Sequence, residues 1–208
     1  MLEAGLRVLR AKGIDAVTMR AVAAELDTGA ASLYVYVAGR EELINEMFDL
    51  VAGEIDLGDD PDPARWREQL EALLTRILQT MERHHGIARV PLANVPTGPN
   101  ATAIADRLIA LLRAGGVDDR SIAWFVDVVF LFVNATAYET SIYVDAGVEH
   151  DSVDENLRNA FGRLDPAAYP NMFSMMELLM SGSGEERFRF GIRLMIEGLL
   201  HAPPPQIP

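Results

Sequence analysis

The sequence contains no cysteine. This absence excludes disulfide bonds, thiolate catalysis and cysteine-ligated zinc, and it fits a protein that works in a reducing compartment. A secretory signal is missing as well, because no N-terminal stretch combines a basic region, a short apolar core and a small-residue cleavage site. We therefore expect a cytoplasmic protein.

Common catalytic motifs are also missing. The sequence has no Walker loop, no Gly-x-Ser-x-Gly elbow and no His-Glu-x-x-His motif. The chain has only four histidines, and the neighbours His84 and His85 would point apart on a helix. We predict that the protein is not an enzyme and holds neither a metal nor a cofactor.

Long apolar runs are rare. The longest candidate, Ile122 to Tyr138, spans 17 residues and is interrupted by Asp127 and Asn134. A membrane span needs about 20 predominantly apolar residues, and charged residues within one are costly. We interpret the segment as a buried core or interface helix and expect no membrane partner.

Basic residues are outnumbered, with 18 Lys and Arg against 31 Asp and Glu, so that the net charge is −13. This balance argues against indiscriminate binding to nucleic acid, because affinity for a polyanion depends on positive side chains. The acidity is localised, however. Residues 1–40 hold five basic and four acidic side chains, a net charge of +1, and the remaining chain carries −14.

Helical spacing of apolar residues recurs along nearly the whole chain, without the sustained alternation of strands, and predicts an all-α fold. We expect a small N-terminal domain over residues 1–45, a connecting helix over about 40–57, and a larger helical domain over 61–202. The acidic segment 58–63 between them resembles a calcium loop in composition only. It lacks the glycine and distal glutamate of an EF-hand, so we interpret it as a solvated linker.

Residues 18–37 have the pattern of a helix-turn-helix. Thr18 can cap a helix that carries Val22 and Leu26, a tight turn follows at residues 27–29, and a short third helix runs through Leu33 to about Val37. Leu33 and Val37 can pack onto the preceding helix because they are four residues apart. A short helix that exposes small and aromatic residues after such a turn is the device that enters the major groove of DNA, although three packed helices alone are also compatible with a purely structural role.

Three runs of residues carry a family resemblance: Thr18–Leu26 (TMRAVAAEL), Ser32–Val37 (SLYVYV) and Arg40–Leu43 (REEL). Together they resemble the signature of the TetR (tetracycline repressor) family, and Glu186–Gly191 with Glu197–Leu199 more loosely resembles the last helix of its C-terminal domains. The resemblance implies a ligand-responsive transcription regulator, commonly a repressor, that binds a near-palindromic operator in double-stranded DNA as a homodimer and is released by a small-molecule effector. The positions that match the family's DNA contacts are Thr18, Arg20, Ala30, Ala31, Ser32, Tyr34, Tyr36 and Arg40.

Several residues depart from the family pattern. Asp27 stands where the turn usually has glycine, Gly29 where a small hydroxyl residue is common, and Tyr36 where histidine or an aromatic residue is usual. Met1 falls inside the first helix, so the basic arm that often precedes it is missing, which points to an upstream start and to weak DNA binding by this version. An alternative function is therefore a helical small-molecule-binding or adaptor dimer that does not bind DNA.

The resemblance also implies that the helices around residues 121–144 and 185–200 pair with their mates in a four-helix interface. The sequence supports this independently, because 122–138 is apolar around most of its circumference; a core helix of a single domain is the alternative. A ligand pocket is expected from adaptable apolar side chains mixed with a few polar ones, each of which would otherwise be core. The candidate pocket residues are Met81, His84, Phe130, Asn134, Tyr138, Phe173, Met176 and Met180.

Overall fold

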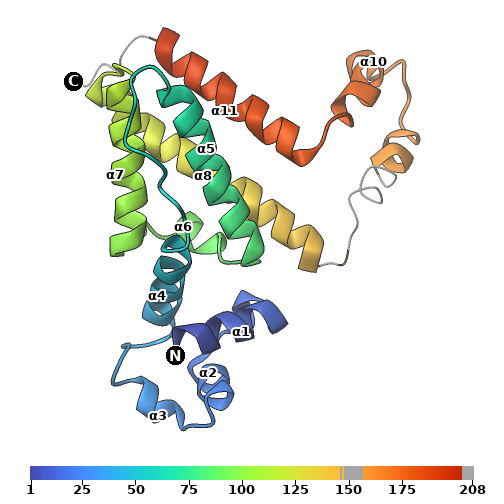
Figure 1. The fold of residues 1–208 in the computed structure, drawn as a ribbon. Helices are drawn as coiled ribbons and strands as arrows, with labels where there is room; N and C mark the ends of the chain where they lie inside the picture. The colour runs from blue at the N-terminus through green and yellow to red at the C-terminus, as the bar shows by residue number, and fades with distance from the viewer. Residues whose placement is uncertain (146, 148–156, 203–208) are drawn as a thin grey trace, which may run out of the picture.

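The computed structural model describes residues 1–145, 147 and 157–202. Within these ranges the chain forms helices and turns without a β-strand, which confirms the all-α prediction. Figure 1 shows a small lobe below a larger helical bundle, with one helix running between them. The predicted two-part architecture is thereby confirmed.

The helix ends of the N-terminal lobe are set by local residues that can be recognised in the sequence. Gly13, at φ 77°, ends the first helix, and the hydroxyl of Thr18 accepts a hydrogen bond from the N–H of Ala21 at 3.1 Å to cap the second. Asp27 takes the left-handed conformation, φ 52°, in the turn that follows. The elements are α1 (Leu2–Lys12), the 3-10 turn η1 (Ile14–Ala16), α2 (Met19–Glu25) and α3 (Ala30–Leu33).

Two helices end earlier in the structure than the sequence predicted. The third helix ends at Leu33 rather than near Val37, and the amides of Tyr36 and Val37 close a turn onto the Leu33 carbonyl. Helix α4 (Arg40–Ala52) ends before the predicted 57. The amides of Glu54 and Ile55 bond to carbonyls three residues back, which tightens the chain out of the α-helical path.

Helix α4 is buried in both parts of the molecule. Leu43 and Met47 are fully buried where α4 packs against α1. The two helices approach closely at Gly5, because a Cβ there would lie 2.5 Å from the Met47 sulfur. Phe48 and Val51 continue along α4 into the larger bundle, where the helix packs on α7 and α5. The two parts therefore share one helix.

The larger bundle is centred on α5, which packs against α7, α8 and α11. Leu70, Leu73 and Leu74 of α5 and Val129 and Val133 of α8 have no exposed surface. The bundle elements are α5 (Trp66–Arg83), α6 (Arg89–Ala93), α7 (Pro99–Ala114), α8 (Asp119–Asp145) and α11 (Gly184–His201).

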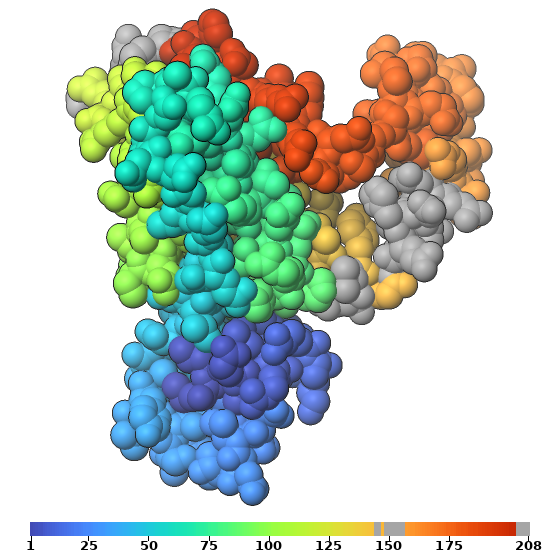
Figure 2. Space-filling model, viewed as in Figure 1, coloured from blue at the N-terminus to red at the C-terminus, as the bar shows by residue number. Residues whose placement is uncertain are grey.

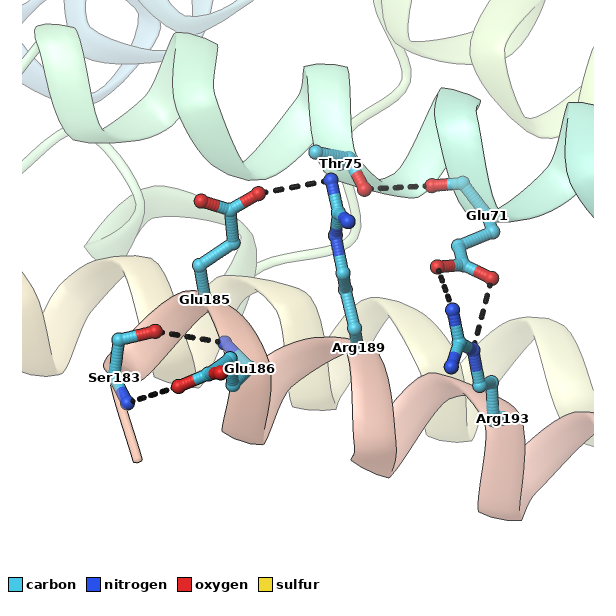
Figure 3. Close-up of polar contacts among 7 residues, drawn as sticks. All are labelled: Glu71, Thr75, Ser183, Glu185, Glu186, Arg189 and Arg193. Atoms are coloured by element: carbon cyan, nitrogen blue, oxygen red, sulfur yellow. Dashed lines mark hydrogen bonds and ion pairs between the residues drawn. The ribbon is translucent and has the colours of Figure 1, made fainter. Parts of the chain in front are cut away.

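Polar contacts fix α11 along α5, as Figure 3 shows. Arg193 donates from Nε and Nη2 to the Glu71 carboxylate at 3.3 and 3.2 Å.

At the start of α11, Ser183 and Glu186 form a reciprocal capping box. Hydrogen bonds from Ser183 lower the pKa of Glu186, so the stability that this cap provides is present at neutral pH and is lost as the pH falls through that lowered pKa.

Helix α8 is long and apolar enough to cross a membrane by length and composition alone, with a mean hydropathy of 1.6 over its best window. It is nevertheless a helix of the bundle, because it packs against α5, α6, α7 and α11. One face is buried and another carries exposed apolar side chains. This agrees with the prediction of a core or interface helix.

Helix α10 (Pro170–Leu179) has no buried residue. Figures 1 and 2 show that it projects away from the bundle beyond the start of α11. Tyr169, Met175 and Leu178 are 52%, 46% and 64% exposed. The position of α10 decides where three of the predicted pocket residues lie.

Asp49 joins α4 to the first turn of α7. Its Oδ1 accepts from the amide of Ala101 and its Oδ2 from the side chain of Asn100, both at 3.0 Å. We expect Asp49→Ala to lower the free energy of unfolding by about 1–3 kcal/mol, because the change removes the acceptor of the Ala101 amide and leaves Asn100 bonded only to the backbone carbonyl of residue 49. Urea denaturation followed by circular dichroism measures this loss.

Asp106→Ala, at an exposed position of α7, is the matched control and should unfold near the wild-type urea concentration. Equal midpoints for the two variants would show that the Asp49 cap contributes nothing to stability.

Candidate DNA-binding surface and ligand pocket

The segment around α3 presents an exposed face at the far end of the small lobe (Figure 1). Leu33 and Val37 point inward, at 3% and 4% exposed, as their spacing predicted. The outward residues are Ala31, Ser32, Tyr34, Val35 and Tyr36, with Ala30 half-buried. Val35, which is 81% exposed, was not among the predicted contacts because valine usually packs inward.

The predicted serine and threonine contacts already have partners within the lobe. Ser32 Oγ donates to the Gly29 carbonyl at 2.7 Å and lies 3.1 Å from Thr28 Oγ1. Thr18 Oγ1 accepts the capping bond from Ala21. Both side chains are still exposed, so Thr18 keeps its proton for a phosphate, whereas Ser32 is left mainly with acceptor capacity.

The two predicted arginine contacts differ. Arg40 Nε donates to the Val17 carbonyl at 2.7 Å and Nη2 to the Ile14 carbonyl at 2.9 Å, so its side chain ties the start of α4 to the loop before α2. Arg20 is exposed and has no hydrogen-bond or ion-pair partner among the described residues. Arg20 is therefore the predicted cation that is available for a phosphate, and Arg40 has a structural role in this conformation.

A cavity of about 430 Å³ lies within the larger bundle. Its buried part is formed by Phe48 of α4, Ile77 and Met81 of α5, and Ile104 of α7, while Val95 lies 86% exposed at the rim. Helix α8 supplies one wall of the cavity with six residues. These are Asp127 and, around it, Ala123, Val126, Phe130, Leu131 and Asn134. The size and the apolar lining are those of a small-molecule site.

Three of the eight predicted pocket residues line this cavity: Met81, Phe130 and Asn134. His84 is buried, but its Nε2 lies 2.9 Å from Glu54 Oε2 where the chain leaves α4, and its Nδ1 has no partner in the described part of the chain. Tyr138 packs against the core beyond Asn134. Phe173 and Met176 lie on α10 and Met180 directly follows it, outside the cavity, because this segment leaves the bundle.

Sequence reasoning missed the cavity residues that follow α5. Pro91, Leu92, Val95 and Pro96 line one side, although the prolines predicted only a bend there. Phe48 was also missed, because its position matches the apolar face of α4 and gives no sign of a ligand. The only available signal was the unusual density of apolar residues in a proline-rich segment.

Two elements touch both the cavity and the N-terminal lobe. Phe48 of α4 lines the cavity one residue after Met47, which is buried against α1. Pro91 and Leu92 of α6 line it too, while Arg89 at the start of α6 forms an ion pair with Asp15 of η1 at 3.0 Å. A molecule in the cavity would therefore contact the elements that hold the small lobe in place.

A helix-turn-helix lobe with an exposed third helix, joined through a shared helix to a bundle with a small-molecule cavity, defines a DNA-binding regulator that senses a ligand. The comparisons with known families agree with this class. Residues 1–47 match the bacterial regulatory proteins of the tetR family, and residues 60–202 match the tetracyclin repressor-like C-terminal domain. The chain belongs to the TetR family of transcriptional regulators, whose members bind DNA and are not enzymes.

Individual relatives support this assignment. The HTH-type transcriptional repressor DrrR1 of Streptomyces coeruleorubidus is 28% identical over 204 residues, which cover 96% of this chain and 75% of the relative. The structure of apo ActR from Streptomyces coelicolor matches with a TM-score of 0.83 at 33% identity, covering 96% of this chain and 94% of ActR. The complex of ActR with actinorhodin matches with the same coverage and TM-score at 35% identity.

We expect Arg20→Ala to weaken DNA binding and to lower the salt dependence of the affinity by about one counterion, because one phosphate contact is lost. Fluorescence anisotropy on a DNA fragment enriched from a random library, repeated over a range of salt concentrations, measures both effects.

Arg65→Ala is the matched control, because Arg65 is an exposed arginine that directly precedes α5, outside the small lobe and outside α8 and α11. Assignment of Arg20 to the DNA contact would be abandoned if its variant kept the wild-type affinity and salt slope.

Proposed function

We propose that the protein is a cytoplasmic, homodimeric repressor that binds a near-palindromic operator and releases it when a small molecule occupies the cavity. The observation that carries this proposal is the sharing of α4, which places Met47 in the small lobe and Phe48 in the cavity wall. Two relatives add support: DrrR1 is a transcriptional repressor, and ActR has been solved with bound actinorhodin and with (S)-DNPA.

The proposed dimer face is the exposed side of α8 and α11. On α8, Trp124 and Val128 are 56% and 52% exposed, and on α11 Phe190 and Leu194 are 65% and 57% exposed. The helices pack closely, because a Cβ at Gly191 would lie 2.6 Å from the Phe132 ring. Apolar side chains on two adjacent helices favour a helical partner surface, and a second copy of the chain would form a four-helix interface.

A twofold dimer explains how such a small recognition element reads DNA specifically. A single α3 segment offers few base contacts, whereas two related copies would reach half-sites about one helical turn apart in a near-palindromic operator. The acidic remainder of the chain would stay away from the phosphates, because the contacts named above all lie in the nearly neutral N-terminal segment.

Release would follow from a population shift. A ligand that contacts Phe48 of α4 and Leu92 of α6 binds best to the conformer whose cavity it fits. If this conformer holds the two α3 segments at the wrong separation, ligand binding lowers operator affinity by the same coupling factor with which DNA lowers ligand affinity.

The decisive experiment is an unbiased selection of DNA fragments by the purified protein at near-physiological salt. Enrichment of a short palindrome supports the repressor and supplies the operator for release assays. Failure to enrich any sequence, repeated with an N-terminally extended chain, would favour the alternative of a ligand-binding dimer that does not read DNA.

We expect Val128→Asp to abolish dimerisation at micromolar concentration, because it places a charge in the proposed apolar interface. Light scattering coupled to size exclusion should then report the 22.8 kDa of one chain instead of about twice that mass.

Val35→Asp is the matched control, since it makes the same chemical change at an exposed position of the small lobe. This variant should remain dimeric and lose DNA affinity by charge repulsion from the phosphates. A dimeric Val128→Asp protein would place the interface elsewhere.

A further inference from the structure

The cavity contains a single charged side chain. Of the residues that line it, Asp127 alone carries a formal charge, and no Arg, Lys or His is among these described residues. Asp127 also has no ion-pair or hydrogen-bond partner within the described ranges. The two arginines of α7 pair with other carboxylates, Arg107 with Asp60 at 3.6 Å and Arg113 with Asp119 at 2.9 Å.

The cavity also contains one buried polar side chain that has no hydrogen-bond partner among the described residues. Asn134 is 6% exposed, lines the cavity, and makes no hydrogen bond to any residue that the structure describes. Other polar side chains on α8 satisfy themselves locally: Thr136 donates to the Phe132 carbonyl and Ser141 to the Tyr138 carbonyl. A buried amide is normally hydrogen-bonded, so the amide of Asn134 is available to a molecule inside the cavity.

Asp127 and Asn134 lie on the same side of α8. Seven residues separate them, which corresponds to about two helical turns and a rise of about 10 Å. Phe130 and Leu131 lie between them and also line the cavity. The wall thus offers the carboxylate of Asp127 at its exposed end and the amide of Asn134, which can both donate and accept, at its buried end. An apolar surface formed by Phe130 and Leu131 lies between them.

We infer that the effector is an elongated, largely apolar cation, such as an aromatic amine, whose positive group faces Asp127 and whose opposite end reaches Asn134. This inference rests on the proposed ligand-responsive function and specifies its ligand. A carboxylate or phosphate ligand would meet an uncompensated negative side chain, whereas a cation would gain both a partner and attraction by the chain's net charge of −13.

The test uses probes that share one aromatic body and differ in the polar group attached to it. 1-Pyrenemethylamine, 1-pyrenemethanol and 1-pyrenecarboxylate share one aromatic body and carry positive, zero and negative charge at neutral pH. Their dissociation constants are measured by fluorescence anisotropy against the wild-type protein. We expect the amine to bind tightest and the carboxylate weakest, with about a tenfold ratio between them.

Asp127→Asn should lower the affinity for the amine by about fivefold, leave the alcohol unchanged and remove the preference for positive charge. Asp106→Asn is the matched control, because it makes the same change in net charge at an exposed position of α7 that does not line the cavity. It should keep the wild-type order of the probes.

The remaining outcomes separate this inference from the proposed function. Equal or tighter binding of the carboxylate, or an unchanged order in Asp127→Asn, would overturn the cation preference while the ligand-responsive function stands. Loss of dimerisation in Asp127→Asn would make Asp127 an interface residue and overturn the inference. Binding of none of the probes, with operator binding intact, would overturn both the inference and the ligand-responsive part of the proposed function.

Discussion

The burial of α4 in two cores is the constraint on which the rest of the structure depends. Met47 fills the space that Gly5 leaves open in α1, and Phe48, the next residue, faces the cavity. A packed core resists continuous deformation, so a displacement of Phe48 is transmitted along a rigid helix rather than absorbed. Asp49 adds a polar link by capping α7. The small lobe therefore has no orientation that is independent of the bundle.

The distribution of polarity follows from the same arrangement. The N-terminal lobe is nearly neutral, and its exposed segment after α2 carries small and aromatic side chains. The bundle is acidic outside, apolar along the exposed faces of α8 and α11, and apolar inside the cavity except for Asp127 and Asn134. Each surface is thus suited to a different kind of contact: nucleic acid, a second chain and a small molecule.

Sequence reasoning succeeded where the determining interactions are local. The caps at Thr18 and Gly13 depend on residues within one turn, and the inward direction of Leu33 and Val37 depends only on helical spacing. Sequence reasoning was less successful for the ligand pocket, because only three of the eight predicted pocket residues line the cavity. Periodicity identifies the apolar face of a helix, but it does not distinguish packing against a neighbour from facing an empty space.

The sequence by itself determined the helical class and the helix-turn-helix with its outward residues, because both depend on short-range patterns. It also determined the family, because one contiguous signature near the N-terminus identifies it. Only the tertiary structure decided that Arg40 donates to carbonyls more than 20 residues away while Arg20 has no partner in the described part of the chain. It also decided that α10 leaves the bundle and that Asp127 and Asn134 share a cavity with Phe48. These outcomes depend on contacts between distant segments, which the folded chain alone brings together.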